Sequence, residues 1–275
     1  MEKLHGVPES MLIPVAARAL ETYEKKPIVK DPHSEKMFRK LNYDFDQITK
    51  DWTTQLGISI RTYILDMLVN DFVKNNEKAF IINIGCGLDT RFDRLSMKGI
   101  PWVDIDVPDV INIRKRFFTE SENHVMIAKS MFDYKWIDEV KSAASYADGL
   151  DILVIFEGVL MYFDDKEIQA LIKTIDSQFS NCKLTFAIEC CSETIAKHTS
   201  KHKSVSHLKS KPVFKSRYNQ FKEAQKWFPK GIRLEKEYNY FDYFHRRWGI
   251  FGLCRYIPFL KNRLNNKILV AATKR

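Results

Sequence analysis

The sequence lacks a long hydrophobic run, a low-complexity tract and any cysteine spacing typical of a metal site. The best candidate for a membrane span, residues 152–163, is interrupted by Glu157 and falls short of the roughly 20 residues that a spanning helix needs. The five cysteines are odd in number, as expected of reduced cytosolic thiols. Glu2, His5 and Glu9 precede any apolar stretch, so we expect no secretory signal. These absences predict a cytoplasmic protein without a transmembrane segment.

The composition is that of an ordinary globular protein. Hydrophobic residues make up 45% of the 275 residues and charged residues 29%, which excludes disordered and collagenous proteins. At this length one large α/β domain, with or without an insertion, is favoured over two independent domains.

The net charge of +9 is unevenly distributed along the chain. Residues 1–193 carry a net charge of −7, whereas residues 194–222 and residues 243–275 each contain eight basic residues and no acidic one. An acidic first part and two basic later segments are expected to have different roles.

Short apolar runs alternate with helical patterns from Ala79 onward, which is typical of a parallel sheet covered on both faces. The expected strands are 80–84, 102–107, 124–128, 152–156, 183–189, 233–240 and 268–272. The expected helices are 11–20, 58–74, 91–97, 110–118, 136–144 and 166–179. Pro27 and Pro32 are expected to interrupt the helical pattern. The pattern predicts a doubly wound, seven-stranded, mostly parallel α/β sheet.

The alternation fails between Glu189 and Arg233, where the connection is too long for a simple crossover. We interpret this stretch as a helical cap over the carboxyl edge of the sheet, where open α/β sheets bind ligands. The expected organisation is a single domain made of four parts: an N-terminal helical region (1–78), a cofactor-binding core (79–193), a cap insertion (194–232) and C-terminal strands (233–275).

A glycine-containing turn follows the first expected strand. Gly85 and Gly87 permit positive φ and close approach of the backbone to a ligand. Thr90 stands where a dinucleotide-binding motif has its third glycine, and no P-loop is present, so the motif is neither of these. A structural turn without a ligand is an equally common interpretation of such a pair.

Asp106 strengthens the ligand-binding interpretation. It ends the second strand, 21 positions after Gly85, where a carboxylate can accept both hydroxyls of a ribose. Asp104 shares its strand face, so a solvated strand end and an Asp-x-Asp metal site are alternatives. No further ligands cluster nearby, and we predict no metal.

Three segments resemble a known family: residues 85–91 (GCGLDTR), 103–108 (VDIDVP) and 156–163 (FEGVLMYF). They are similar to the leucine carboxyl methyltransferase/tetracenomycin-type polyketide O-methyltransferase family, class I enzymes that depend on S-adenosylmethionine (SAM). Residues 12–19, 30–32 and 42–45 resemble its polyketide-type branch. The resemblance implies a Rossmann-like fold, with SAM as cofactor and S-adenosylhomocysteine as its product.

The resemblance also implies where the cofactor would bind. Gly85 and Gly87 would approach its methionine and ribose, and Asp106 would hold the ribose hydroxyls. The residues implied for the remainder of the cofactor are Arg61 for the carboxylate, Arg18 as a second arginine, Ser130 and Met131 beside the adenine, and Glu157 near the amino group. Ser130 departs from the family, which usually has Asp there, but its hydroxyl can still accept a hydrogen bond.

Glu157 is also a site candidate on physical grounds. A carboxylate in an apolar strand end is costly to bury unless it is paired, and a cationic ligand would supply the partner. The alternative is an ion pair with Arg61 or Arg91.

No catalytic residue is predicted. Methyl transfer depends mainly on in-line positioning, and a carboxylate acceptor needs no base. His198, His202 and His207 lie in a basic segment typical of solvated surface, and His245 is expected to be structural.

We expect an SAM-dependent O-methyltransferase acting on a hydroxyl or carboxyl oxygen of a small molecule. An anionic substrate would suit the basic segments. A protein carboxyl methyltransferase and a nucleic-acid methyltransferase are alternatives; for the latter, Trp227, Tyr238, Tyr240 and Trp248 would stack on bases. Residues 246–260 could also rest on a membrane or an acidic helix, although an ordinary buried helix is the default expectation. A SAM sensor and an NAD-dependent oxidoreductase stay open, as does the oligomeric state.

Overall fold

The structure is a computed structural model, which describes residues 9–41, 51–143, 145–197 and 213–274. Seven strands form one sheet in the order β3-β2-β1-β4-β5-β7-β6. The strands are β1 (Ala79–Ile84), β2 (Trp102–Asp106), β3 (His124–Ala128), β4 (Asp151–Phe156), β5 (Lys183–Cys190), β6 (Ile232–Asn239) and β7 (Lys267–Thr273). β7 runs antiparallel to both of its neighbours, β5 and β6, and the other neighbouring strands are parallel. The predicted fold is confirmed, with every strand end within one residue of its expected position.

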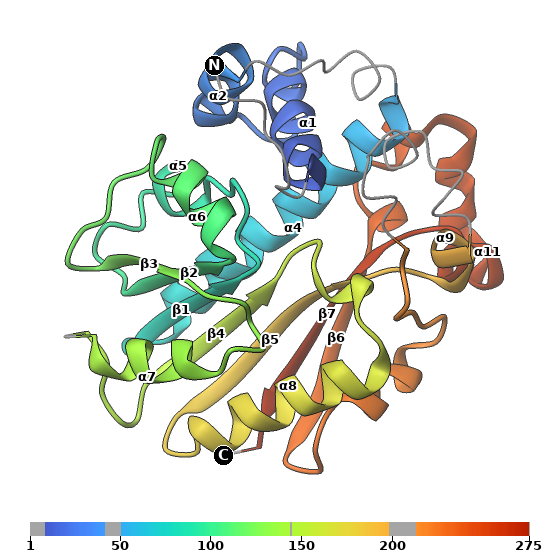
Figure 1. The fold of residues 1–275 in the computed structure, drawn as a ribbon. Coiled ribbons are helices and arrows are strands. Elements are labelled where there is room, and N and C mark those ends of the chain that lie inside the picture. The colour runs from blue at the N-terminus through green and yellow to red at the C-terminus, as the bar shows by residue number, and fades with distance from the viewer. Residues whose placement is uncertain (1–8, 42–50, 144, 198–212, 275) are drawn as a thin grey trace.

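Helices cover both faces of this sheet (Figure 1). The α-helices are α1 (Leu12–Thr22), α2 (Pro32–Lys40), α4 (Trp52–Asn75), α5 (Arg91–Arg94), α6 (Pro108–Arg114), α7 (Lys135–Ser142), α8 (Asp165–Gln178), α9 (Glu193–Lys197) and α11 (Pro258–Arg263). The 3-10 helices are η1 (Glu9–Met11), η2 (Leu160–Tyr162), η4 (Phe221–Trp227), η5 (Tyr240–Asp242) and η6 (His245–Tyr256). No helix in the described part of the chain is long and apolar enough to cross a membrane.

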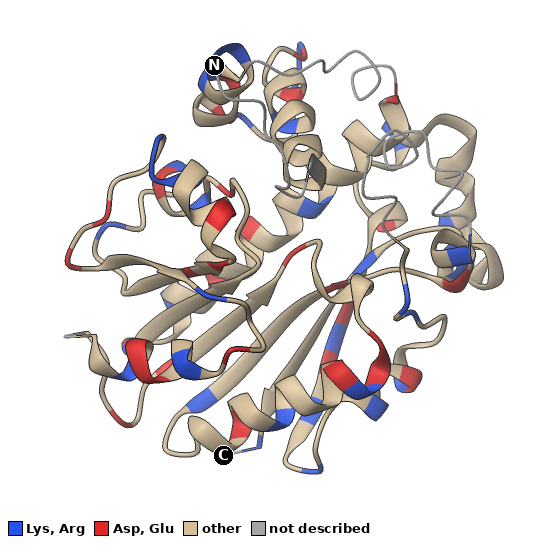
Figure 2. Ribbon diagram, viewed as in Figure 1, with Lys and Arg blue, Asp and Glu red and all other residues tan. Residues whose placement is uncertain are grey.

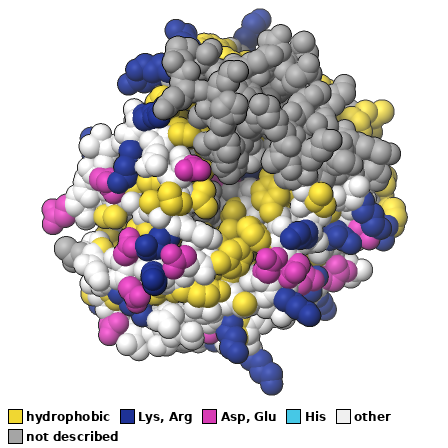
Figure 3. Space-filling view, viewed as in Figure 1, with side chains coloured by type: hydrophobic (Ala, Val, Ile, Leu, Met, Phe, Trp, Pro, Cys, Tyr) yellow, Lys and Arg dark blue, Asp and Glu magenta, His cyan; other side chains and the backbone are white. Residues whose placement is uncertain are grey.

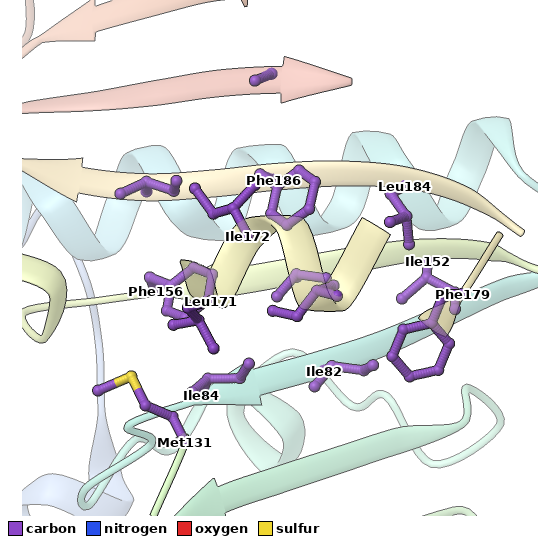
Figure 4. Packing of buried hydrophobic residues seen from close by; sticks show 14 of the residues in the cluster. Ile82, Ile84, Met131, Ile152, Phe156, Leu171, Ile172, Phe179, Leu184 and Phe186 are labelled. Carbon is purple, nitrogen blue, oxygen red and sulfur yellow. The ribbon is translucent and has the colours of Figure 1, made fainter. Parts of the chain in front are cut away.

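Alternate residues of the central strands enter different halves of the core, because successive side chains point to opposite faces. Ile82 and Ile84 of β1 pack with α8 and with neighbouring β4 and β5 residues, as Figure 4 shows. Ile81 belongs instead to the cluster on the α4 face. Both faces of the parallel strands are therefore buried, which explains their continuous apolar sequences.

The helical pattern is interrupted after Thr22, as expected, and residues 23–31 are not helical. Pro32 also begins helix α2, which was not predicted, and the side chain of Asp31 caps this helix by accepting from Ser34 N at 2.9 Å. Proline suits this first position because its missing N–H would have no intrahelical partner.

The expected cap insertion is described at 194–197 and 213–232, and its remaining residues, with His198, His202 and His207, lie outside the described residues. Tyr218, Trp227 and Phe228 join the main core cluster beside α8. Much of the described stretch therefore completes the core, while Ile195 and Phe214 line the cavity described below.

Candidate functional site

A cavity of about 590 Å³ lies at the carboxyl ends of β1, β2, β4 and β5. It sits where the strand order reverses between β1 and β4, the usual ligand position in open α/β sheets. Figure 3 shows hydrophobic side chains gathered around the hollow on this face. The cavity is lined by all eight predicted site residues: Arg18, Arg61, Gly85, Gly87, Asp106, Ser130, Met131 and Glu157.

The turn after β1 needs both of its glycines. Gly85 has φ +69° and Gly87 has φ +51°, a region that side chains with a Cβ rarely adopt. A Cβ on Gly85 would also lie 2.8 Å from Cγ2 of Val159, which follows β4. The turns after β1 and β4 therefore meet in close contact at the floor of the cavity.

Asp106 links this turn to β2. Its Oδ2 accepts from Gly87 N and its Oδ1 from Val107 N, both at 2.8 Å. Burial raises the pKa of Asp106 despite these two hydrogen bonds. Each carboxylate oxygen keeps a lone pair, so the side chain can accept two further hydroxyl groups.

Glu157 lies between two arginines. Its Oε1 is 2.8 Å from Arg61 Nε, and its Oε2 accepts from Arg91 Nη2 at 2.7 Å. Burial alone would raise the pKa of Glu157, but the two guanidinium groups hold it well below its ordinary value. The structure therefore supplies the ion-pair alternative, and it does so within the cavity wall.

These pairs belong to a larger network of buried charges. Arg91 also pairs with Asp66 at 2.9 Å and with Asp89 at 2.5 Å, and Arg94 binds Asp66 as well. The network includes four arginines and five carboxylates: Arg18, Arg61, Arg91, Arg94, Asp31, Asp66, Asp89, Glu157 and Glu189. Figure 2 shows both signs of charge on α1, α4 and α5, which contribute to it.

Arg18 is held mainly by structural contacts. It donates to Asp31 at 2.8 Å, to Ser34 at 3.1 Å and to the carbonyl oxygen of Leu88 at 2.9 Å. It therefore fastens α1 to α2 and to the glycine turn while its side chain borders the cavity.

Ser130 and Met131 follow β3 at the cavity wall. Ser130 Oγ accepts from Phe132 N at 3.3 Å, and Met131 packs into the main core cluster. The predicted position of both residues beside a ligand is compatible with this placement, since each also lines the cavity.

Sequence reasoning missed Glu189 as a cavity residue. Glu189 is the second-last residue of β5 and accepts from Arg61 Nη1 at 2.8 Å, from the Tyr240 hydroxyl at 2.9 Å and from Asn266 Nδ2 at 3.3 Å. The signal was available, because Glu189 is a carboxylate at the end of an apolar run, as Glu157 is.

Asp104 is neither a solvated strand end nor part of a metal site. It is fully buried and binds Arg114, His124 at 2.6 Å and the indole N–H of Trp102 at 3.0 Å. Its pKa falls to about 2 because these partners outweigh burial, which alone would raise it. Among the described residues, no group of His, Cys, Asp or Glu could hold a metal ion.

Tyr162 and Phe163 line the cavity. Cys190 and Cys191 are buried, and burial raises the pKa of both thiols, to about 12 for Cys191. Buried, protonated thiols are poor nucleophiles. His245 is exposed at the start of η6 and outside the cavity lining.

The aromatic residues proposed to stack on bases are mostly buried. Trp227, Tyr240 and Trp248 belong to core clusters, and Tyr238 is partly buried against one. Base stacking needs an open ring face. This part of the nucleic-acid alternative was wrong.

The known proteins that the chain resembles agree with the geometry of the cavity. The family model for leucine carboxyl methyltransferase matches residues 11–176, more than half of the chain. The tetracenomycin polyketide synthesis O-methyltransferase of Streptomyces glaucescens is 29% identical over 174 residues, covering 63% of this chain and 62% of that protein. An S-adenosyl-L-methionine-dependent methyltransferase of Gibberella zeae is 27% identical over 191 residues, covering 64% of this chain and 62% of that protein. The chain thus spans about three fifths of the length of these curated relatives.

The fold is shared more widely. A DUF574 family protein from Streptomyces avermitilis has a TM-score of 0.60 at 12% identity, covering 94% of this chain and 97% of that chain. At this identity the similarity concerns the fold alone.

Proposed function

Because the chain belongs to the leucine carboxyl methyltransferase family, we propose that it transfers a methyl group from SAM to an oxygen of a small molecule. The observation that carries the proposal is the convergence of all eight predicted cofactor residues, from six separate segments, on one cavity. Residues that merely stabilised the fold would not be expected to share a single cavity wall.

The residues present fit the cofactor. Asp106 would accept the ribose hydroxyls with its remaining lone pairs, and the glycine turn would let the backbone approach. Carboxylates outnumber guanidinium groups in the network, and this surplus favours a ligand with positive charge. When bound, SAM supplies a methyl group on a positively charged sulfur.

The chain contributes positioning and exclusion of water. Glu157 and Arg61 would orient the charged end of the cofactor, while Ser130 and Met131 would border its adenine. Another part of the cavity lining is apolar and includes Ile195, Phe214, Phe241, Trp248 and Phe251. An acceptor with an apolar body would be held there with its oxygen in line with the methyl group, which is where most of the rate arises.

We extend the proposal to the organisation of the chain. Residues 79–193 would hold the cofactor, 1–78 and 233–275 would complete the walls, and 194–232 would cover the acceptor. The five cysteines are free and buried, in keeping with a reducing compartment such as the cytoplasm.

Calorimetry on the full chain tests cofactor binding. SAM and S-adenosylhomocysteine should bind, and NAD should not. Asp106→Asn should weaken SAM at least about tenfold, because a hydrogen bond to a charged group is worth roughly 1.5–3 kcal/mol. Asp109→Asn, on the exposed start of α6, is the matched control and should retain wild-type affinity.

Turnover is tested with radiolabelled SAM against phenols, alcohols, small carboxylic acids and a peptide with a free C-terminus. Transfer to a small molecule supports the proposal, while transfer to the peptide alone supports the carboxyl methyltransferase that the family name describes. SAM binding without transfer to any acceptor would indicate a sensor. RNA binding with a steep salt dependence would support the nucleic-acid alternative.

A further inference from the structure

The segment formed by η6 and α11, residues 245–263, exposes an unusual number of large apolar side chains. Ile250 is 78% exposed, Tyr256 70%, Phe259 63% and Leu253 60%. The default expectation of an ordinary buried helix was therefore wrong for this segment. Single exposed apolar residues are common, but a contiguous group of them typically marks an interaction surface.

The fold holds these side chains outward. Trp248 is buried on the inner side, where its indole N–H donates to the carbonyl oxygen of Tyr240 at 3.3 Å, and Cys254 is also buried. Gly252 faces inward so tightly that a Cβ would lie 2.2 Å from the carbonyl oxygen of His245. The segment is thus anchored on one side and presents the other to the surroundings.

Basic residues accompany the apolar ones. Arg263 lies 4.6 Å from the centre of the Phe259 ring, and Arg255 lies 5.1 Å from that of Tyr256. Neither they nor the exposed Arg246 form an ion pair with a carboxylate in the described part of the chain. No acidic residue occurs from position 243 to the end of the sequence.

We propose that this segment, together with the exposed flanking residues Phe244 and Leu264, docks the protein on an anionic membrane surface. Aromatic and aliphatic side chains beside arginines are the combination that binds the interface of an acidic bilayer, where each basic residue contributes about 1 kcal/mol. A membrane is favoured over an acidic helix because the exposed apolar residues belong to two short elements and stand outward from them.

The docking surface reaches the mouth of the main cavity. Phe251 and Leu264 are both exposed, and both line that cavity. An apolar acceptor can therefore pass from the bilayer to the cavity along these side chains. This consequence rests on the proposed function, in which methyl transfer occurs in the cavity.

Co-sedimentation of the full chain with vesicles tests the docking. Vesicles of phosphatidylcholine with phosphatidylglycerol should bind the protein, and pure phosphatidylcholine vesicles should bind it much more weakly. Leu253→Ser/Phe259→Ser and Arg246→Gln/Arg255→Gln/Arg263→Gln should each weaken binding at least about tenfold.

Two controls match these variants. Tyr23→Ser removes an exposed ring outside the docking segment, and Lys166→Gln/Lys173→Gln/Lys230→Gln removes three charges from α8 and the loop before β6. Both controls should retain binding. Circular dichroism and SAM calorimetry on every variant report whether the fold and the cofactor site are intact.

Three outcomes would overturn the docking: no binding to anionic vesicles, equal binding to neutral ones, or equal losses in the controls. A wild-type dimer that Leu253→Ser/Phe259→Ser converts to monomers would also overturn it, by making the surface a self-interface. Vesicle binding without SAM binding would leave the docking standing and reject the proposed function instead.

Discussion

Glu157 shows how one side chain can serve the fold and a ligand site together. The two carboxylate oxygens contact different arginines, yet Glu157 also lines the cavity. The sequence indicated a buried carboxylate that needs a partner, and two internal partners are present. An ion pair inside the cavity wall does not exclude a ligand role, because carboxylate oxygens accept more than one hydrogen bond.

Glu157→Gln should weaken SAM binding at least about tenfold, since it removes a charge that faces the cavity. Isothermal calorimetry is the measurement. The control is Asp66→Asn, which also removes a carboxylate partner of Arg91 but lies outside the cavity lining. Unchanged affinity in Glu157→Gln, or an equal loss in both variants, would remove Glu157 from the binding site.

Gly85→Ala should lower the free energy of unfolding by at least about 2 kcal/mol, through both positive φ and the contact with Val159. Urea unfolding measures the change. Adding Val159→Ala should recover only part of the steric cost, because Cβ of residue 159 would still lie 2.9 Å from the added Cβ. Gly99→Ala is the control, because nothing lies within 4 Å of the added Cβ and no positive φ is recorded there. Equal stability of the two alanine variants would contradict the close approach of the turns.

Among the helices and strands, the elements that could be predicted were those whose burial is visible in their sequence pattern. The parallel strands were predictable because β1 and β4 are buried on both faces and carry continuous apolar runs. α2 was overlooked although its start has a local signal, an Asp31 N-cap followed by Pro32 at the first helical position. The η6 segment was misread because its composition alone does not distinguish a buried helix from an exposed apolar surface.

Some of the cavity residues could likewise be predicted from a local sequence pattern, and others could not. Positions with a local signal, such as Gly85 and Asp106, could be selected from the turn and strand end. Arg18 and Arg61 came from family resemblance alone, because no local pattern shows that a distant helix returns to the sheet edge. Glu189 had a local signal and was overlooked.

Helix α8 offers a test at the scale of a single element. The side chain of its N-cap residue Asp164 accepts from the backbone N–H groups of Lys166 and Glu167. In turn, Glu167 Oε2 accepts from the backbone N–H of Asp164. Asp164→Ala should destabilise the protein by about 1 kcal/mol, measured by urea unfolding. Lys173→Ala, on the exposed side of the same helix, should stay within about 0.5 kcal/mol. A loss no larger than that of the control would mean that the cap contributes nothing.

For the whole molecule, the buried carboxylates predict that the free energy of unfolding falls at low pH. The pKa values of Asp31 and Asp104 fall to about 2, since their arginine partners outweigh the opposing effect of burial. Their stabilisation, roughly 2 kcal/mol each, is complete above the ordinary aspartate pKa near 4 and is lost as pH falls toward 2. The raised pKa values of Asp89 and Asp106 act in the opposite direction and offset part of this loss.

Calorimetric Tm values should therefore stay level between about pH 7 and pH 5 and decline below about pH 4. Salt at neutral pH should have little effect, because these pairs are buried and poorly screened. A Tm that rises or stays constant from pH 4 to pH 2.5 would contradict the assignment of depressed pKa values.

The span of the charge network has a consequence for the order of folding. Its members lie on α1, α4, α5 and β5, just before α2, and in the turns after β1 and β4. Arg61 and Glu189, which pair with each other, are 128 positions apart in the chain. Contacts between such distant positions form late, after the loops between them have closed. The central strands β1 and β4 close a shorter loop, since Ala79 pairs with Asp151. We therefore expect the cavity to be the last region to become native, so that refolding chains recover secondary structure before they recover ligand binding.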